Sequence, residues 1–153
     1  MASEEGHKEI VELLIEKGID INQTNKYGEN ALHFASEEGH KEIVKLLIEK
    51  GIDINQTNKD GQNALHLAFL RGHIEIVKLL IEKGIDINQT DSYGLNALHL
   101  ASAEGKTEVV KLLIEKGIDI NQTNKYGQNA LHWASVYGKT EIVEILTLVR
   151  LRF

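Results

Sequence analysis

The sequence predicts an all-α solenoid, in which stacked helix-turn-helix units are joined by hairpin-like loops. Three observations indicate this fold: two segments recur, both recur every 33 residues, and an apolar stripe at helical spacing precedes the internal copies of the second segment. The first segment, NALH, begins at Asn30, Asn63, Asn96 and Asn129. The second, GIDINQT, begins at Gly18, Gly51, Gly84 and Gly117. Such a period is typical of solenoids, whose units bury their apolar faces only against each other.

The period also sets the domain organisation. No part of the 153 residues differs enough in composition to mark a second domain. We therefore expect residues 1–153 to form a single repeat domain. Its predicted units are a partial repeat 1–24, three full repeats 25–57, 58–90 and 91–123, and a C-terminal repeat 124–153 with an altered end.

Each full repeat is predicted to contain two helices. In the repeat 25–57, Asn30 can cap the first helix, because its side chain accepts hydrogen bonds from the free amides at a helix start. This helix continues through Ala35 and is broken by Gly39. The second helix is predicted over about residues 41–50, where one stripe is apolar at helical spacing. The stripe consists of Ile43, Val44, Leu46, Leu47 and Ile48.

A loop closes each repeat. Gly51 suits the left-handed conformation that ends many helices. The following residues, IDINQTNKYG, alternate between apolar and polar and end in turn-forming types. We therefore predict an extended, hairpin-like loop.

The two ends lack the polar caps that a solenoid needs. The chain begins inside a first helix, and the next segment, KEIVELLIEKG, keeps the apolar pattern of a second helix. At the other end Arg150 replaces the stop glycine, and the final helix is predicted to continue to the last residue. We expect one or both ends to self-associate with a second chain; the abrupt start also suggests a truncated or engineered protein. The apolar residues that follow helical spacing in the final helix are Ile142, Ile145, Leu146, Val149 and Phe153.

The repeat resembles that of ankyrin repeat proteins over essentially the whole chain. Where that family has TPLH, this chain has NALH, which should keep the geometry, because Asn caps helices as well as Thr and Ala is a good helix former. The resemblance implies a non-enzymatic scaffold that binds a protein partner through its loop tips and inner helices. In the repeat 25–57 the matching residues are Gly28, Leu32, His33, Ala35, Gly39, His40, Ile43, Val44, Leu46, Leu47, Gly51, Asp53 and Asn55.

Variation between the copies predicts where a partner binds. Residues 44–57, 77–90 and 110–123 are identical, so this half of the repeat is scaffold. The copies differ at the loop tip and late in the first helix, and loops on a rigid scaffold are where binding residues tend to lie. The predicted protein-binding residues are Tyr27, Asp60, Leu70, Arg71, Tyr93, Leu95, Tyr126, Val136 and Tyr137.

Some of these residues allow a second interpretation. The three tip tyrosines either contact a partner or pack on the neighbouring loop. Leu70, Leu95 and Val136 are predicted to be exposed, because other copies have polar residues or alanine there; they form a binding patch or are scattered surface residues. Trp133 is predicted to be in the core or half-buried, because its equivalents in the other repeats are all apolar.

The sequence gives no indication of catalytic or metal chemistry. The resemblance implies structural roles for the NALH histidines, and a solenoid spreads equivalent residues in a line, whereas a metal needs converging ligands. The chain has no Cys, nucleophile motif or phosphate-binding loop. We therefore expect no enzyme activity, no metal and no cofactor.

Charge and hydropathy limit the classes of partner that we expect. The net charge of −6 disfavours a nucleic acid partner. No apolar run reaches the roughly 20 residues of a membrane helix, and the N-terminus lacks the features of a signal peptide. A natural protein is thus expected to be cytoplasmic. The near-identity of the copies leaves one alternative open, a designed or excised repeat scaffold with no dedicated partner.

Overall fold

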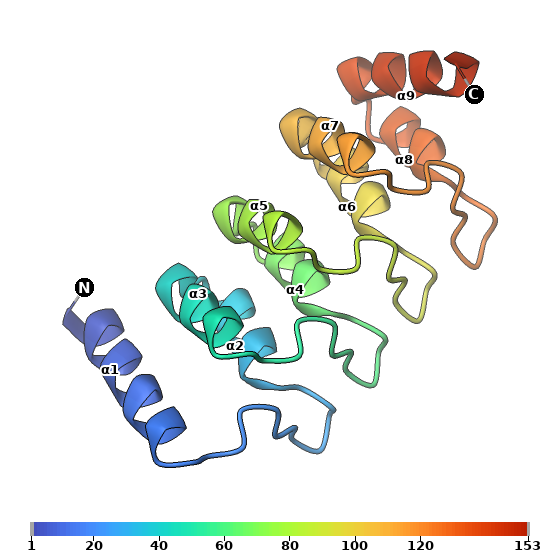
Figure 1. Cartoon of the computed structure of the whole chain (residues 1–153). Helices are drawn as coiled ribbons and strands as arrows, with labels where there is room; N and C mark the ends of the chain where they lie inside the picture. The colour runs from blue at the N-terminus through green and yellow to red at the C-terminus, as the bar shows by residue number, and fades with distance from the viewer. Residues whose placement is uncertain (1, 153) are drawn as a thin grey trace. The chain divides into compact units, whose positions relative to one another are not determined.

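A computed structural model describes the chain from residue 2 to residue 152 and the side chains of residues 7–151. The chain divides into two compact units, Met1–Ile85 and Asp86–Phe153. All regular elements in the described residues are helices, with no strand among them. Figure 1 shows helix pairs followed by long loops, as the repeat predicts.

The first unit contains two complete helix pairs and one helix before them. Its inner helices, α2 and α4, pack against each other, and its outer helices pack in the order α1, α3, α5. Each inner helix also packs on the outer helix that follows it. The helices are α1 (Ala2–Glu16), α2 (Ala31–Glu38), α3 (Lys41–Glu49), α4 (Ala64–Leu70) and α5 (Ile74–Glu82).

The second unit repeats this arrangement with two helix pairs. Inner helix α6 packs against α8, and outer helix α7 packs against α9. Within each pair, α6 packs on α7 and α8 packs on α9. The helices are α6 (Ala97–Glu104), α7 (Thr107–Glu115), α8 (Ala130–Val136) and α9 (Thr140–Arg152).

The NALH segment begins every inner helix through a reciprocal cap. At α2, the Asn30 side-chain oxygen accepts a hydrogen bond from the His33 backbone N–H at 3.1 Å. In return, the Asn30 backbone N–H donates to His33 Nδ1 at 3.0 Å. The same capping box starts α4, α6 and α8. Two free amides at each helix start are thereby satisfied, which confirms the predicted capping role of asparagine.

The apolar stripe of the outer helices lies in the core, together with apolar residues of the inner helices such as Leu32 and Leu65. Val44, Val77 and Val110 are fully buried at equivalent positions of three repeats. Burial of each such side chain contributes roughly 1.5–3 kcal/mol before conformational entropy is subtracted. The isoleucines that follow three of the stop glycines, Ile52, Ile85 and Ile118, are also buried at the base of their loops, whereas Ile19 after the first stop glycine is 53% exposed.

The two terminal helices differ in how well they follow the sequence pattern. The sequence predicts the end of a first helix before the segment KEIVELLIEKG, but residues 2–16 form the single helix α1. Residues 2–5 are rich in good helix formers and form the N-terminal part of this helix. Helix α9 continues through Arg152, as predicted, and Phe153 lies outside the described residues.

Candidate protein-binding surface

Each loop tip is a tight turn closed by the side chain of its first residue. In the first tip, Asn25 Oδ1 accepts hydrogen bonds from the backbone N–H groups of Tyr27 at 2.9 Å and Glu29 at 3.0 Å. Asn58, Asp91 and Asn124 close the other tips in the same way. The tip side chains are therefore presented on a hydrogen-bonded frame instead of a mobile loop.

Neighbouring tips are bonded to each other within each unit. The Lys59 N–H donates to the Tyr27 carbonyl in the first unit, and the Lys125 N–H donates to the Tyr93 carbonyl in the second, both at 2.9 Å. The tips approach closely, because a Cβ atom on Gly94 would lie 2.9 Å from the Asn124 Cα atom. In each unit, two tips thus lie side by side.

The tip tyrosines are exposed and also contact neighbouring lysines. Tyr27 and Tyr93 are each 54% exposed, and Tyr126 is 71% exposed. The Lys125 ammonium lies 4.2 Å from the Tyr93 ring centroid and 5.2 Å from that of Tyr126. Such cation–π contacts attract the ammonium group to the face of the ring. Tyr93 therefore packs on the next tip and still remains available to a partner.

The three apolar residues that were predicted to be exposed differ in their exposure. Leu70 is 56% exposed and Val136 is 73% exposed, as expected. The prediction for Leu95 is wrong, because its side chain is half-buried. Leu95 closes the tip turn: its N–H donates to Asp91 Oδ1, and its carbonyl accepts from the Asp91 N–H. These two bonds hold the residue close to the loop.

The remaining predicted residues lie at the ends of the inner helices and at the second tip. Arg71 donates to Glu37 Oε1 from Nη2 at 2.7 Å and from Nε at 3.2 Å, and this carboxylate raises the pKa of Arg71. Tyr137 is exposed and packs edge-on against the half-buried Trp133, with ring centroids 6.2 Å apart. Asp60 is exposed on the second tip.

Sequence reasoning missed one surface residue, Phe34. It is 47% exposed, whereas Leu67, its equivalent in the next repeat, is 6% exposed. All four repeats carry an apolar residue at this place, so the pattern alone indicates a core position. The exposure of Phe34 is seen only in the structure, in which the buried residues of α2 lie on either side of it.

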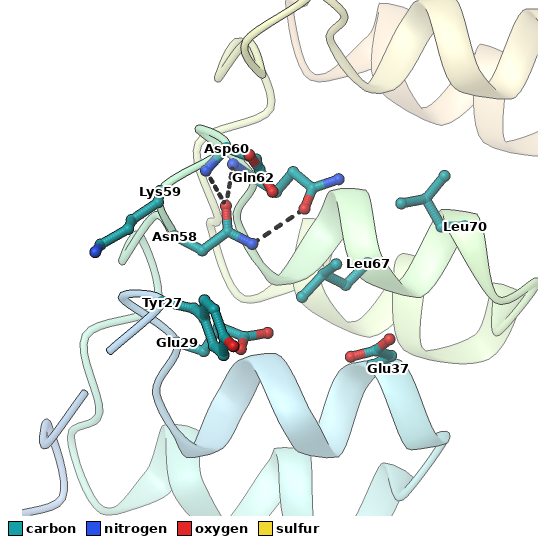
Figure 2. Close-up of a pocket in the computed structure, with 9 residues that line it drawn as sticks. All are labelled: Tyr27, Glu29, Glu37, Asn58, Lys59, Asp60, Gln62, Leu67 and Leu70. Atoms are coloured by element: carbon teal, nitrogen blue, oxygen red, sulfur yellow. Dashed lines mark hydrogen bonds between the residues drawn. The ribbon is translucent and has the colours of Figure 1, made fainter. Parts of the chain in front are cut away.

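A groove runs across the surface between the first two tips and inner helices (Figure 2). Its volume is about 560 Å³. The groove combines apolar side chains from α4, carboxylates from the first tip, the second tip and α2, and the polar frame of the second tip. It is lined by Tyr27, Glu29, Glu37, Asn58, Lys59, Asp60, Gln62, Leu67 and Leu70.

The NALH histidines connect one repeat to the next. The Nε2 atom of His33 lies 3.1 Å from the Gln62 carbonyl, and that of His99 lies 2.9 Å from the Gln128 carbonyl. Since Nδ1 of each ring accepts the backbone N–H of the cap asparagine, Nε2 carries the proton and donates. Burial lowers the pKa of both histidines, against a smaller opposing effect of these hydrogen bonds.

The described residues also bear on metal sites and membrane spans. No group of three or more His, Asp or Glu side chains in them is arranged to hold a metal ion. None of the helices in this part of the chain has the length and apolar character needed to cross a membrane.

Comparison with known proteins identifies the repeat. A family model described as ankyrin repeats (3 copies) matches residues 1–91 and 88–149. No curated protein matches the chain. The matches cover nearly the whole sequence and agree with the helix pairs and loops of both units. The chain therefore belongs to the ankyrin repeat family, whose repeats are generally protein–protein interaction modules and typically non-enzymatic.

Proposed function

We propose that this chain is a binding module that holds a protein partner on its loop tips and inner helices. One observation carries the proposal: large exposed apolar and aromatic side chains gather at the positions that vary between otherwise identical repeats. In the first unit these side chains are Tyr27, Phe34 and Leu70. In the second unit they are Tyr93, Tyr126, Val136 and Tyr137. Exposed apolar patches commonly mark interaction sites.

The rigidity of the tips supports the same function. The tip turns are closed by side-chain hydrogen bonds, and adjacent tips are joined through their backbones. A partner would thus meet a surface that is already ordered, so little conformational entropy is lost on binding. Tyrosine and arginine, both present here, are common among the residues that dominate interface energies.

A second candidate function is a designed or excised scaffold that has no dedicated partner. The observation in its favour is the identity of residues 44–57, 77–90 and 110–123. Independent drift of natural repeats would be expected to change some of these positions, whereas recent duplication or design would leave them equal.

Capture of a partner from cell lysate distinguishes the two functions. We expect the immobilised wild-type chain to retain a specific protein and the alanine variant of the tip and inner-helix residues to lose it. The substituted side chains are exposed, so the thermal melting curve should shift little. The variant replaces Tyr27, Leu70, Arg71, Tyr93 and Tyr137.

The matched control changes the opposite, outer surface. The substitutions Glu49→Ala, Glu82→Ala and Glu115→Ala lie at equivalent exposed positions of three outer helices and should leave capture intact. Capture that survives the tip and inner-helix variant would reject the proposed surface. A wild-type chain that retains no protein from any lysate would favour the second function.

The proposal has four further parts. The chain acts as one domain over residues 1–153, has no catalytic activity or cofactor of its own, and works inside the cell if it is natural. It also self-associates through exposed apolar side chains of its first and last helices. Leu13 is 53% exposed on α1, and Leu151 is 79% exposed on α9.

A further inference from the structure

The groove of the first unit has an excess of negative charge. Glu29, Glu37 and Asp60 line it, and Lys59 is the one cation among its lining residues. Figure 2 shows the Lys59 side chain extending away from Leu67 and Leu70, so that its ammonium does not lie over the groove. Two further cations lie near the lining residues. Arg71 is bound to Glu37, and the Lys26 ammonium lies 5.1 Å from the centroid of the Tyr27 ring.

Each of the three carboxylates has an oxygen that makes no hydrogen bond or ion pair with another described residue. Both bonds from Arg71 end on Glu37 Oε1, which leaves Oε2. The Asn25 amide donates to Glu29 Oε1, which likewise leaves Oε2. The Asp60 backbone N–H donates to Asn58 Oδ1, while its carboxylate makes no hydrogen bond or ion pair within the described part of the chain. The groove therefore presents hydrogen-bond acceptors that carry charge.

The apolar part of the groove lies next to these acceptors. Leu70 is 56% exposed, and Leu67 forms part of the wall. In Figure 2, Leu67 lies between Glu37 and the polar residues of the second tip. A segment that fills the groove would meet an aliphatic surface and a carboxylate within the reach of one or two side chains.

The second unit supplies an internal comparison. Its repeats keep the tyrosine, asparagine, lysine and glutamine of the tips, as Tyr93, Asn124, Lys125 and Gln128. All three carboxylates, however, are replaced by uncharged residues. The equivalents of Glu29, Glu37 and Asp60 are Leu95, Ala103 and Tyr126. The acidic character thus belongs to the first unit alone and is not required by the repeat scaffold.

We infer that the groove between the first two tips binds a protein segment in which a lysine or arginine is adjacent to an apolar side chain. This inference rests on the proposed function and specifies the chemistry of the partner. The basic group binds the free carboxylate oxygens, and the apolar group packs on Leu67 and Leu70. The charge of the partner is complementary to that of the groove and to the net charge of −6 of the chain.

Selection from a display library of random linear peptides tests this inference. We expect the wild-type chain to enrich peptides with Arg or Lys beside an apolar residue. The charge-neutral variant Glu29→Gln, Glu37→Gln and Asp60→Asn keeps side-chain size, and its affinity for an enriched peptide should be at least about tenfold lower. Replacing the basic residue of that peptide with glutamine should weaken its binding to the wild type to the same extent.

The control variant removes the same number of charges outside the groove of the first unit. Glu42→Gln, Glu49→Gln and Glu75→Gln change exposed residues of α3 and α5 and should leave the affinity unchanged. Enriched peptides without a basic residue, or equal affinity of the charge-neutral variant, would overturn the inference while the proposed function stands. Failure of the wild type to enrich any peptide would count against both.

Discussion

At Gly94, the close approach of two loop tips restricts which residue the chain can have. Its φ of +80° lies in the left-handed region, and an added Cβ atom would lie 2.9 Å from the Asn124 backbone. Gly127, one repeat later, has a φ of +73° but no atom within 4 Å of such a Cβ. Both glycines therefore have a left-handed backbone, but only at Gly94 would a side chain also clash with a neighbouring tip.

The substitution Gly94→Ala is expected to destabilise the protein by roughly 2–4 kcal/mol, because backbone strain and a backbone clash both act. Gly127→Ala is the matched control, for which strain alone predicts about 1 kcal/mol. Urea unfolding of the two variants measures the difference. Equal losses of unfolding free energy would show that the tips do not approach each other as described.

At the scale of helices and loops, the histidine network ties each cap to the following tip. His33 is bonded to the cap of α2 and to the Gln62 carbonyl, which lies just before α4. His99 makes the same connection between the α6 cap and Gln128. A proton added to Nδ1 would remove the acceptor of the cap N–H and place a charge in a buried ring.

Acid should therefore weaken the protein through these two histidines. Burial lowers their folded-state pKa below the ordinary value of 6.5, so the native state favours the neutral ring. Their contribution is fully present above the unfolded pKa and is lost as pH falls through the folded pKa. We expect the unfolding free energy to decrease as pH is lowered from about 7 through this window.

The double variant His33→Gln and His99→Gln should have a lower unfolding free energy at neutral pH. Its unfolding free energy should also change less with pH in this range. His132→Gln is the control, because that ring is exposed although it caps α8 in the same way. Glu29 and Glu37 near His33, and Asp91 near His99, oppose the shift, so salt should sharpen the pH dependence. An unchanged slope in the double variant would contradict this account.

At the scale of the whole molecule, net charge and exposed apolar surface have opposite effects on association. The charge of −6 makes copies repel each other. Exposed apolar side chains, with Ile10 at 56% and Leu148 at 62%, favour contact between them. Salt weakens the first effect far more than the second.

Sedimentation velocity should therefore show a mean sedimentation coefficient that rises with protein concentration, and more steeply at high salt. Leu13→Glu adds a charge to the exposed apolar side of α1 and should reduce the rise without unfolding the chain. Glu49→Gln, at an exposed polar position of α3, serves as the control. A monomer at every concentration and salt would rule out self-association through these helices.

The sequence by itself determined the local features of this protein. The inner helices begin after Asn30 and its equivalents, and the valine stripe of the outer helices is buried, as predicted. Caps, stop glycines and apolar periodicity act within a few residues of each other, so the chain encodes them directly. Repetition adds to this, because four aligned copies show which positions vary.

Only the tertiary structure decided which side chains face solvent and which lie together. Phe34 and Leu67 occupy one place in the pattern but differ in exposure, and Leu95 is held by its own turn. Glu37 and Arg71 come from different repeats, yet form an ion pair beside the groove. Exposure and proximity depend on the side chains that neighbouring repeats contribute, and no local pattern contains that information.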